Sequence, residues 1–183
     1  MKQRPAIEPG LADDLRAAIR EVPDFPKKGI LFYDITTLLA DARSFRRAVD
    51  ALAVPHIGEP VDLVVGIEAR GFILGAALAY TLGKGLVVVR KKGKLPARTR
   101  TASYALEYGV DQVEMHEDAV RPGARVIIVD DLLATGGTAA AAVQLVRDCG
   151  GYVVECAFLV ELGSLGGRAR LDGCEVVSLV CYY

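Results

Sequence analysis

A run of apolar, β-branched residues that ends in two adjacent acids constrains this chain more than any other feature. The run reads Val126-Ile127-Ile128-Val129-Asp130-Asp131, and the small-residue turn A-T-G-G-T at 134–138 and an alanine-rich stretch follow it. Four consecutive β-branched residues predict a buried strand, and the alanines predict a helix. Because ligands of open α/β sheets bind outside the carboxyl ends of strands, the acids and the turn mark a candidate binding site.

The turn at 134–138 has the chemistry of a phosphate site. Its backbone N–H groups would face a ligand at a helix N-terminus, and its two threonine hydroxyls are further donors. Its two glycines allow close approach of the backbone. Asp130 and Asp131 are acceptors, suited to vicinal hydroxyls or to a hard divalent cation. Phosphate donors beside hydroxyl acceptors indicate a sugar phosphate.

An ordinary helix start is the alternative interpretation of this segment. In that case the Asp and Thr side chains only satisfy the amides of the first helical turn. A lone T-G-G-T sequence is typical of such a turn. The succession of buried strand, paired acids and glycine turn favours the ligand site.

The rest of the chain alternates between strand-like and helix-like segments, which predicts one α/β domain with a mostly parallel sheet flanked by helices. The polar segment 90–101 has no apolar periodicity and is predicted to be a loop. Strands are predicted at 61–67, 86–89, 125–129, 152–160 and 175–182, helices at 11–22, 41–54, 71–82 and 134–149, and a hairpin that pairs 103–107 with 112–116.

Composition excludes several classes of protein. A formal net charge of -1 argues against a nonspecific nucleic-acid binder. The four cysteines have no C-x-x-C spacing, and with two histidines they indicate buried thiols in a reducing compartment rather than a zinc site. The first ten residues are too polar for a signal peptide, and no uncharged apolar stretch reaches the ~20 residues that span a bilayer. We therefore expect a cytosolic protein with no nucleic-acid or membrane partner.

Two common nucleotide-binding motifs are missing from the sequence. It contains no G-x-x-x-x-G-K-[ST], which argues against a Walker-type ATPase. No G-x-G-x-x-G opens a helix after a strand, because Gly83-Lys84-Gly85 precedes a predicted strand instead.

The segment 126–138 resembles the phosphoribosyl pyrophosphate motif of the type I phosphoribosyltransferases. The resemblance implies that Asp130 and Asp131 bind the ribose hydroxyls. It also implies the fold of that family, with a small N-terminal hood that binds the base (residues 1–36) and a mobile catalytic loop (residues 90–109). The residues that would bind the 5′-phosphate are Ala134, Thr135, Gly136, Gly137 and Thr138.

Two further stretches resemble the adenine-specific branch of this family. The stretch F-P-K-K-G-I-L-F-Y-D-I-T at 25–36 resembles its base-recognition segment, which places Leu31 and Tyr33 at adenine-contacting positions. The stretch G-I-E-A-R-G-F at 66–72 resembles the loop that meets pyrophosphate, where Arg70 offers a bidentate fork. In the family the peptide bond that corresponds to Glu68–Ala69 is often cis.

The octapeptide A-S-Y-A-L-E-Y-G at 102–109 resembles the catalytic loop of the same branch. The resemblance implies that Glu107 acts as a general acid toward the purine N7 or positions the base, and that the neighbouring Tyr108 helps to bind the ligand. In the basic run 90–94, Arg90 and Lys94 match positions that attract pyrophosphate, whereas the other lysines are predicted to form a solvated face.

The activity implied by the resemblance is a step of purine salvage: adenine and phosphoribosyl pyrophosphate give AMP and pyrophosphate by displacement at the anomeric carbon. Arg70 and Glu107 would be the catalytic residues. The implied cofactor is Mg²⁺, held mainly by substrate oxygens, and the implied assembly is a homodimer.

Three other functions remain open from the sequence. A phosphoribosyltransferase for another base is the nearest alternative, and only the segment 25–36 argues against it. A regulatory sensor of phosphoribosyl pyrophosphate would need an effector module, for which a core pattern beginning at Leu11 leaves no room. A phosphohydrolase that binds metal through Asp130 and Asp131 would need further acids and histidines.

Replacement of Glu107 tests the role that the resemblance gives it. The Glu107→Gln variant is expected to lower kcat more than it raises KM, because a group that acts in the transition state contributes little to ground-state binding. Steady-state kinetics with both substrates measure this, and a variant with wild-type kcat would remove Glu107 from the chemistry.

Overall fold

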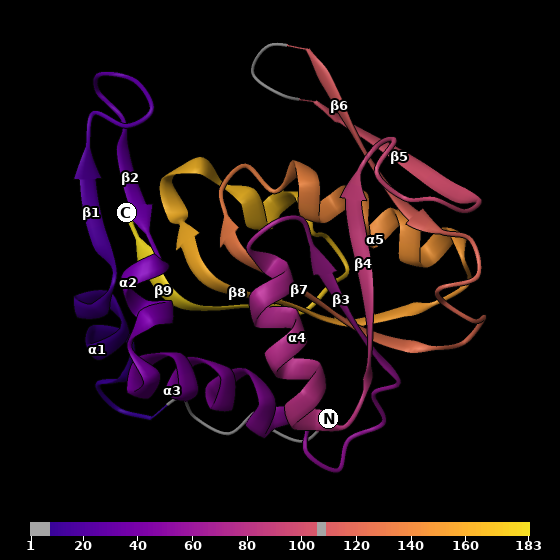
Figure 1. Ribbon diagram of the computed structural model, residues 1–183, viewed down its shortest axis with the longest axis horizontal. Helices are drawn as coiled ribbons and strands as arrows, with labels where there is room; N and C mark the ends of the chain where they lie inside the picture. The colour runs from indigo at the N-terminus through magenta and orange to yellow at the C-terminus, as the bar shows by residue number, and fades with distance from the viewer. Residues whose placement is uncertain (1–7, 106–108) are drawn as a thin grey trace.

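The computed structural model describes residues 8–105 and 109–183, with a seven-stranded sheet at its centre (Figure 1). The strand order is β5-β6-β4-β3-β7-β8-β9. Strands β4, β3, β7, β8 and β9 pair in parallel, whereas β6 pairs antiparallel with both β4 and β5. This arrangement confirms the prediction of a mostly parallel sheet flanked by helices.

One helix lies between β3 and β4 in the chain and another between β7 and β8, whereas among the described residues β4, β5, β6 and β7 follow one another without a helix. The strands of the sheet are β3 (Leu63–Ile67), β4 (Gly85–Lys91), β5 (Thr99–Ala105), β6 (Val110–His116), β7 (Arg125–Leu133), β8 (Tyr152–Leu162) and β9 (Val176–Tyr182). The helices are α1 (Leu11–Ala18), α2 (Thr36–Ala40), α3 (Ala42–Ala53), α4 (Gly71–Leu82) and α5 (Gly137–Asp148). Short 3-10 turns are η1 (Val54–His56), η2 (Gly163–Leu165) and η3 (Gly167–Arg170), and a separate hairpin pairs β1 (Arg20–Pro23) with β2 (Leu31–Asp34).

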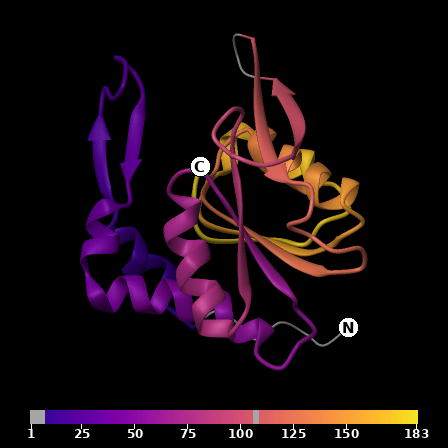
Figure 2. The same cartoon turned by 45° about the vertical axis from the view of Figure 1, so that its right-hand side comes forward.

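Helices cover both faces of the sheet. Helices α1, α3 and α4 lie on one face and α5 on the other (Figures 1 and 2). Strand β7 is buried on both faces of the sheet. Val126 and Ile128 are buried with α5, while Ile127 and Val129 are buried with α4. Burial on both sides is the reason that this strand is a continuous apolar run.

Two helices agree with their predictions. Helix α4 has the predicted bounds 71–82, and α3 fills nearly all of the predicted range 41–54. The carboxylate of Asp41 caps α3 by accepting a hydrogen bond from the Ser44 N–H at 2.7 Å. The helix ends at Ala53, just before the turn that contains Pro55.

Other boundaries differ from the prediction at the ends of β7 and α5. Strand β7 continues to Leu133 because it pairs with β8 as far as Glu161, so Asp130 and Asp131 lie within the strand rather than after it. Helix α5 begins at Gly137 rather than 134, because Gly136 has the left-handed conformation (φ 80°) and cannot be part of the helix.

The predicted loop 90–101 is shorter in the structure. Arg90 and Lys91 belong to β4, where they pair with Glu114 and Val113, and residues 99–101 belong to β5. These strand ends are polar and have no local pattern of a strand. They are extended because they pair with residues of β6 that lie more than ten residues further along the chain.

The predicted helix 11–22 is wrong beyond Ala18. Ile19 is already extended, and residues 20–23 form β1, in which Val22 pairs with Phe32 of β2. The Arg20 Nη2 atom lies 3.3 Å from the Asp34 Oδ2 atom across the hairpin. Pairing between separate segments overrides the helical periodicity here, and a local pattern cannot show it.

The two hairpins, β1–β2 and β5–β6, project on the same side of the molecule (Figures 1 and 2). The carboxyl ends of β3, β4, β7 and β8 point toward the space between them (Figure 1). Within residues 8–105 and 109–183, no helix combines the length and apolar character needed to cross a membrane.

Candidate active site

The turn between β3 and α4 forms one wall of the site. It contains Glu68, Ala69 and Arg70, and the Glu68–Ala69 peptide bond is cis, as the family resemblance implied. The turn lies directly against β7, because a Cβ atom added to Gly71 would lie 2.8 Å from both the Val129 carbonyl oxygen and the Asp130 Oδ1 atom. Only glycine permits this approach.

Glu68 gathers the two cations predicted to attract pyrophosphate. Its Oε1 atom accepts hydrogen bonds from Lys94 Nζ at 2.8 Å and from Arg90 Nη2 at 3.2 Å, and its Oε2 atom accepts one from the Lys91 N–H at 3.0 Å. Burial by itself would raise the pKa of Glu68, but these hydrogen bonds outweigh it and lower the pKa to about 2. An ionised carboxylate therefore holds both cations beside the turn.

The paired acids of β7 differ in their surroundings. Asp131 is ion-paired, because Arg70 Nε donates to its Oδ2 atom at 2.5 Å. Asp130 accepts a hydrogen bond from the Asp131 N–H at 2.8 Å. Burial raises the pKa of Asp130 well above its ordinary value, and the negative charge of Asp131 raises it further. The site thus contains one acid that is paired with an arginine, Asp131, and one acid whose ionisation is unfavourable, Asp130.

The predicted phosphate loop connects β7 with α5. Thr135 is exposed, Gly136 turns the chain through its left-handed conformation, and Gly137 and Thr138 open the helix. The first amides of a helix have no partners within it, so those of α5 are available to an anion. The loop leads into the N-terminus of a helix, as the sequence predicted, although residues 134–136 precede the helix instead of belonging to it.

An open cavity of about 360 Å³ joins these parts. The predicted residues around it are Arg70, Asp130, Asp131, Ala134 and Thr138. Glu68, Ala69, Lys91, Tyr104, Val113 and Leu132 complete the lining. The paired acids of β7, Arg70 and the start of α5 therefore border one space.

A polar cluster on the β5–β6 hairpin was missed by the sequence analysis. The Lys91 ammonium is ion-paired with the Asp111 carboxylate, which also accepts a hydrogen bond from the Tyr104 hydroxyl at 3.0 Å. The hydrogen bond to Asp111 raises the pKa of Lys91, and the same bond lowers that of Asp111. Lys91 was predicted to be solvated, and no local signal relates it to an acid 20 residues away.

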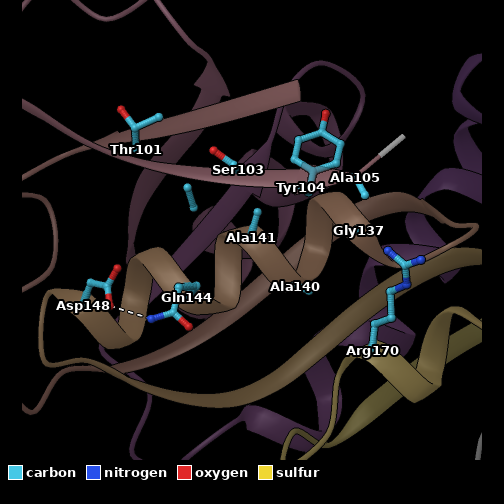
Figure 3. Close-up of a pocket in the computed structure, with 11 residues that line it drawn as sticks. Thr101, Ser103, Tyr104, Ala105, Gly137, Ala140, Ala141, Gln144, Asp148 and Arg170 are labelled. Carbon is cyan, nitrogen blue, oxygen red and sulfur yellow. Dashed lines mark hydrogen bonds between the residues drawn. The ribbon is translucent and has the colours of Figure 1, made fainter. Parts of the chain in front are cut away.

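A second open hollow lies between β5 and α5 (Figure 3). Figure 3 shows Tyr104 and Gly137 at one end of it, and at the other end Gln144 Nε2, which donates to Asp148 Oδ1 at 2.6 Å. Tyr104 lines both this hollow and the cavity at the strand ends. The placement of β5 therefore sets the width of both.

The N-terminal hairpin carries the two residues predicted to contact adenine. The Tyr33 ring stacks on Tyr182 with 3.8 Å between centroids, and Leu31 is 42% exposed. Successive side chains of a strand point to opposite faces, so Phe32 points the other way. Its ring centre lies 5.7 Å from the guanidinium carbon of Arg70. The side chain that reaches the turn is that of Phe32, which the sequence analysis did not single out.

Glu107 and Tyr108 lie outside the described residues. The strands on either side of them are described, and β5 ends at Ala105, directly after Tyr104. The predicted catalytic segment is therefore attached to a strand that borders the cavity.

The sequence is similar to a known domain family and to proteins that share one name. The phosphoribosyl transferase domain family matches residues 36–178. The adenine phosphoribosyltransferase of Geobacter metallireducens is 61% identical over 170 residues, which are 93% of this chain and 99% of that protein.

Solved structures with the same name are similar over nearly the whole chain. The adenine phosphoribosyltransferase of Thermoanaerobacter pseudethanolicus has a TM-score of 0.90 and 53% identity, covering 93% of this chain and 99% of that one. The Saccharomyces cerevisiae protein, solved with adenine and an imino-altritol bisphosphate, has a TM-score of 0.88 and 40% identity, covering 93% and 98%.

The raised pKa of Asp130 makes a prediction about stability. A carboxyl group whose pKa is higher in the folded than in the unfolded state binds protons more readily when the protein is folded. The free energy of unfolding therefore falls as the pH rises from the unfolded-state pKa to the folded-state pKa. Asp130→Asn is therefore expected to raise the Tm at pH 7, because asparagine keeps the shape of the side chain without the charge. The gain should shrink toward pH 4.

Thermal unfolding of the ligand-free protein between pH 4 and pH 8 measures this effect. Asp131→Asn is the matched control, because it removes the partner of Arg70 and is expected to give no gain. An Asp130→Asn variant that is less stable than wild type at pH 7 would contradict the prediction.

Proposed function

This chain belongs to the adenine phosphoribosyltransferase family, and we propose that the cavity at the carboxyl ends of β3 and β7 is its active site. The family transfers a phosphoribosyl group from phosphoribosyl pyrophosphate to adenine, giving AMP and pyrophosphate. One observation carries the assignment of the site: Asp130 and Asp131 line the same cavity as Arg70 and Thr138. This observation supports the proposal, because a sugar phosphate requires acceptors for its hydroxyls beside groups that bind anions.

The donor substrate would use three parts of the site. Asp130 and Asp131 accept hydrogen bonds from the ribose hydroxyls, and the loop 134–138 holds the 5′-phosphate at the start of α5. The pyrophosphate lies against the turn after β3, where Arg70 supplies a bidentate fork. Arg90 and Lys94, gathered by Glu68, are close enough to that turn to add positive charge.

Adenine would bind between the N-terminal hairpin and the ribose. Phe32 extends from β2 toward Arg70 and offers an aromatic face to the purine. Backbone groups near Leu31 and Tyr33 would read N1 and the 6-amino group. A carbonyl acceptor at that position would lose its partner against a 6-oxo purine, which gives a large discrimination.

The donor set suits an Mg²⁺ ion that is carried mainly by substrate oxygens. In the described part of the chain, no three His, Cys, Asp or Glu side chains are grouped to hold a metal. Glu68 and Asp131 are already paired with cations, which leaves Asp130 as the acid of the site able to share the ion. When bound, the ion would offset the charge that builds on the pyrophosphate.

The chain's own residues would then serve the displacement at the anomeric carbon. Arg70 and the cations near Glu68 stabilise the departing pyrophosphate. Glu107 would protonate or position the purine, and movement of the segment 90–109 would exclude water that competes with adenine. Tyr108 would add contacts to the bound donor as that segment closes.

A product assay with a panel of bases tests the proposed function. Adenine, phosphoribosyl pyrophosphate and Mg²⁺ are expected to give AMP and pyrophosphate, with far slower turnover of hypoxanthine, guanine, xanthine, uracil and orotate because the base edge would be mismatched. Turnover of another base would overturn the role of the N-terminal hairpin. Donor binding without any turnover would favour a sensor.

The ribose assignment has a separate control. Donor affinity measured by calorimetry should fall in Asp130→Asn and in Asp131→Asn, while adenine affinity stays near wild type. Unchanged donor affinity in both variants would remove these acids from the donor site without affecting the assignment of the reaction.

We further propose that the protein is a homodimer joined through α4. This helix contains no charged side chain, and Leu74 and Leu78 on its inner side are buried. On its outer side Ile73 is 43% and Tyr80 89% exposed, and these residues lie seven positions apart on one helix face. A helix without charged residues is typical of one covered on both sides, and a second copy of the same face would cover it.

Tyr80→Glu is expected to shift the protein toward monomers, because the interface would bury an unpaired charge. Analytical ultracentrifugation measures this, with Tyr152→Glu as the control at a tyrosine that is 60% exposed on β8. A monomeric wild-type protein, or equal effects of the two changes, would contradict this assignment of the interface.

The cytosol is the compartment that the cysteines favour. All four are free thiols, and Cys149 and Cys156 are buried. Such thiols persist in a reducing environment.

A further inference from the structure

The turn η3 packs directly against the loop 134–138. A Cβ atom added to Gly136 would lie 2.4 Å from the Gly167 carbonyl oxygen, and one added to Gly167 would lie 2.3 Å from the Ala134 carbonyl oxygen. The two backbones are thus in direct contact, with no side chain between them. A displacement of η3 would have to move the loop as well.

A buried carboxylate fixes η3 to the sheet. Arg168 Nε donates to Glu161 Oε1 at 2.8 Å and to Oε2 at 3.0 Å, and Arg168 Nη2 donates to Oε2 at 2.8 Å. Arg168 Nη1 donates to the Val176 carbonyl oxygen at 2.8 Å. The Glu161 side chain is only 8% exposed. One guanidinium group therefore joins η3 to the end of β8 and the beginning of β9.

Glu161 also lies beside the residue that precedes the loop. In the parallel register of β7 and β8, Glu161 pairs with Leu133, the residue before Ala134. The ion pair therefore links the residue beside Leu133 with the turn that contacts the loop. Neither Glu161 nor Arg168 is among the described residues that line the cavity at the strand ends.

We propose that the Glu161–Arg168 ion pair positions the loop 134–138 for the 5′-phosphate of the donor. This inference rests on the proposed function of that loop. The pair fixes η3, and the contact of Gly167 with Ala134 and Gly136 fixes the loop in turn. Both residues act through the backbone, so they are positioning residues and not catalytic ones.

A selective effect on the phosphate end of the donor follows from this arrangement. Loss of the ion pair would let η3 and the loop move, while the β1–β2 hairpin, which carries the groups proposed to bind adenine, is held by its own strand pairing. Binding of a 5′-phosphate should weaken, and binding of adenine should not.

The experiment compares Arg168→Met and Glu161→Gln with Arg46→Met. Arg46 is ion-paired with Asp50 on the surface of α3 and is the control. Ribose 5-phosphate is the probe for the loop in calorimetry, and kinetics give KM for each substrate and kcat. The first two variants are expected to bind ribose 5-phosphate and the donor about tenfold more weakly, since a small misplacement of a binding group has effects of this order or larger. Adenine KM, kcat and the control should stay near wild type.

Two further variants separate positioning from general loss of structure. Arg168→Lys keeps the charge and is expected to recover part of the affinity, and this variant decides the question if Arg168→Met does not fold. The double variant should bind no more weakly than either single one, because both changes break the same interaction. Gly167→Ala should weaken ribose 5-phosphate binding with the ion pair intact.

Unchanged ribose 5-phosphate affinity in Arg168→Met and Glu161→Gln would overturn the inference. Equal losses in adenine KM, kcat and Tm would also overturn it, because they would show a purely structural role. The proposed function fails differently: a wild-type protein that makes no AMP would refute it, whereas selective loss of ribose 5-phosphate binding in the variants would still support the positioning role.

Discussion

The parallel pairing of β3 with β7 is the constraint on which the site depends. In this register Gly66 pairs with Val129, so both strands end at one edge of the sheet. The Arg70–Asp131 ion pair, which joins residues 61 positions apart, forms because of that pairing. Gly71 then allows α4 to begin against β7, since any Cβ atom there would meet the Val129 backbone. The cavity is a consequence of how two strands and one helix meet.

Most of the charged side chains in and around the site already form an ion pair with a side chain of opposite charge. Glu68 holds Arg90 and Lys94, Arg70 is bonded to Asp131, and Lys91 is bonded to Asp111. These pairs keep long side chains in fixed places in or beside the cavity wall, which reduces the entropy that is lost when a ligand orders them. Asp130 differs, because burial and its acidic neighbour make its charge unfavourable. A stability cost at this residue is typical of functional sites.

Particular segments show what a sequence can predict and why. Helix α4 has its predicted bounds because a run of mostly apolar residues extends from Gly71 to Gly83, and Gly83 ends the helix in a left-handed conformation (φ 64°). The acids and the glycine turn were located because they are adjacent in the chain. The hairpin strand β1 was misassigned to a helix, since its pairing with β2 is not a local property. Lys91 and Phe32 were missed for the same reason: their partners, Asp111 and Arg70, are far away in the sequence.

The sequence by itself determined the α/β class, the parallel strands and the glycine loop before α5, because burial on both sides of a strand and the freedom of glycine are written in consecutive residues. The family was also recognisable from consecutive residues. Only the tertiary structure decided which cations share Glu68, which face of β2 reaches the turn, and that Gly167 supports the loop. These contacts depend on the register and packing of separate elements, and the local order of residues does not contain that information.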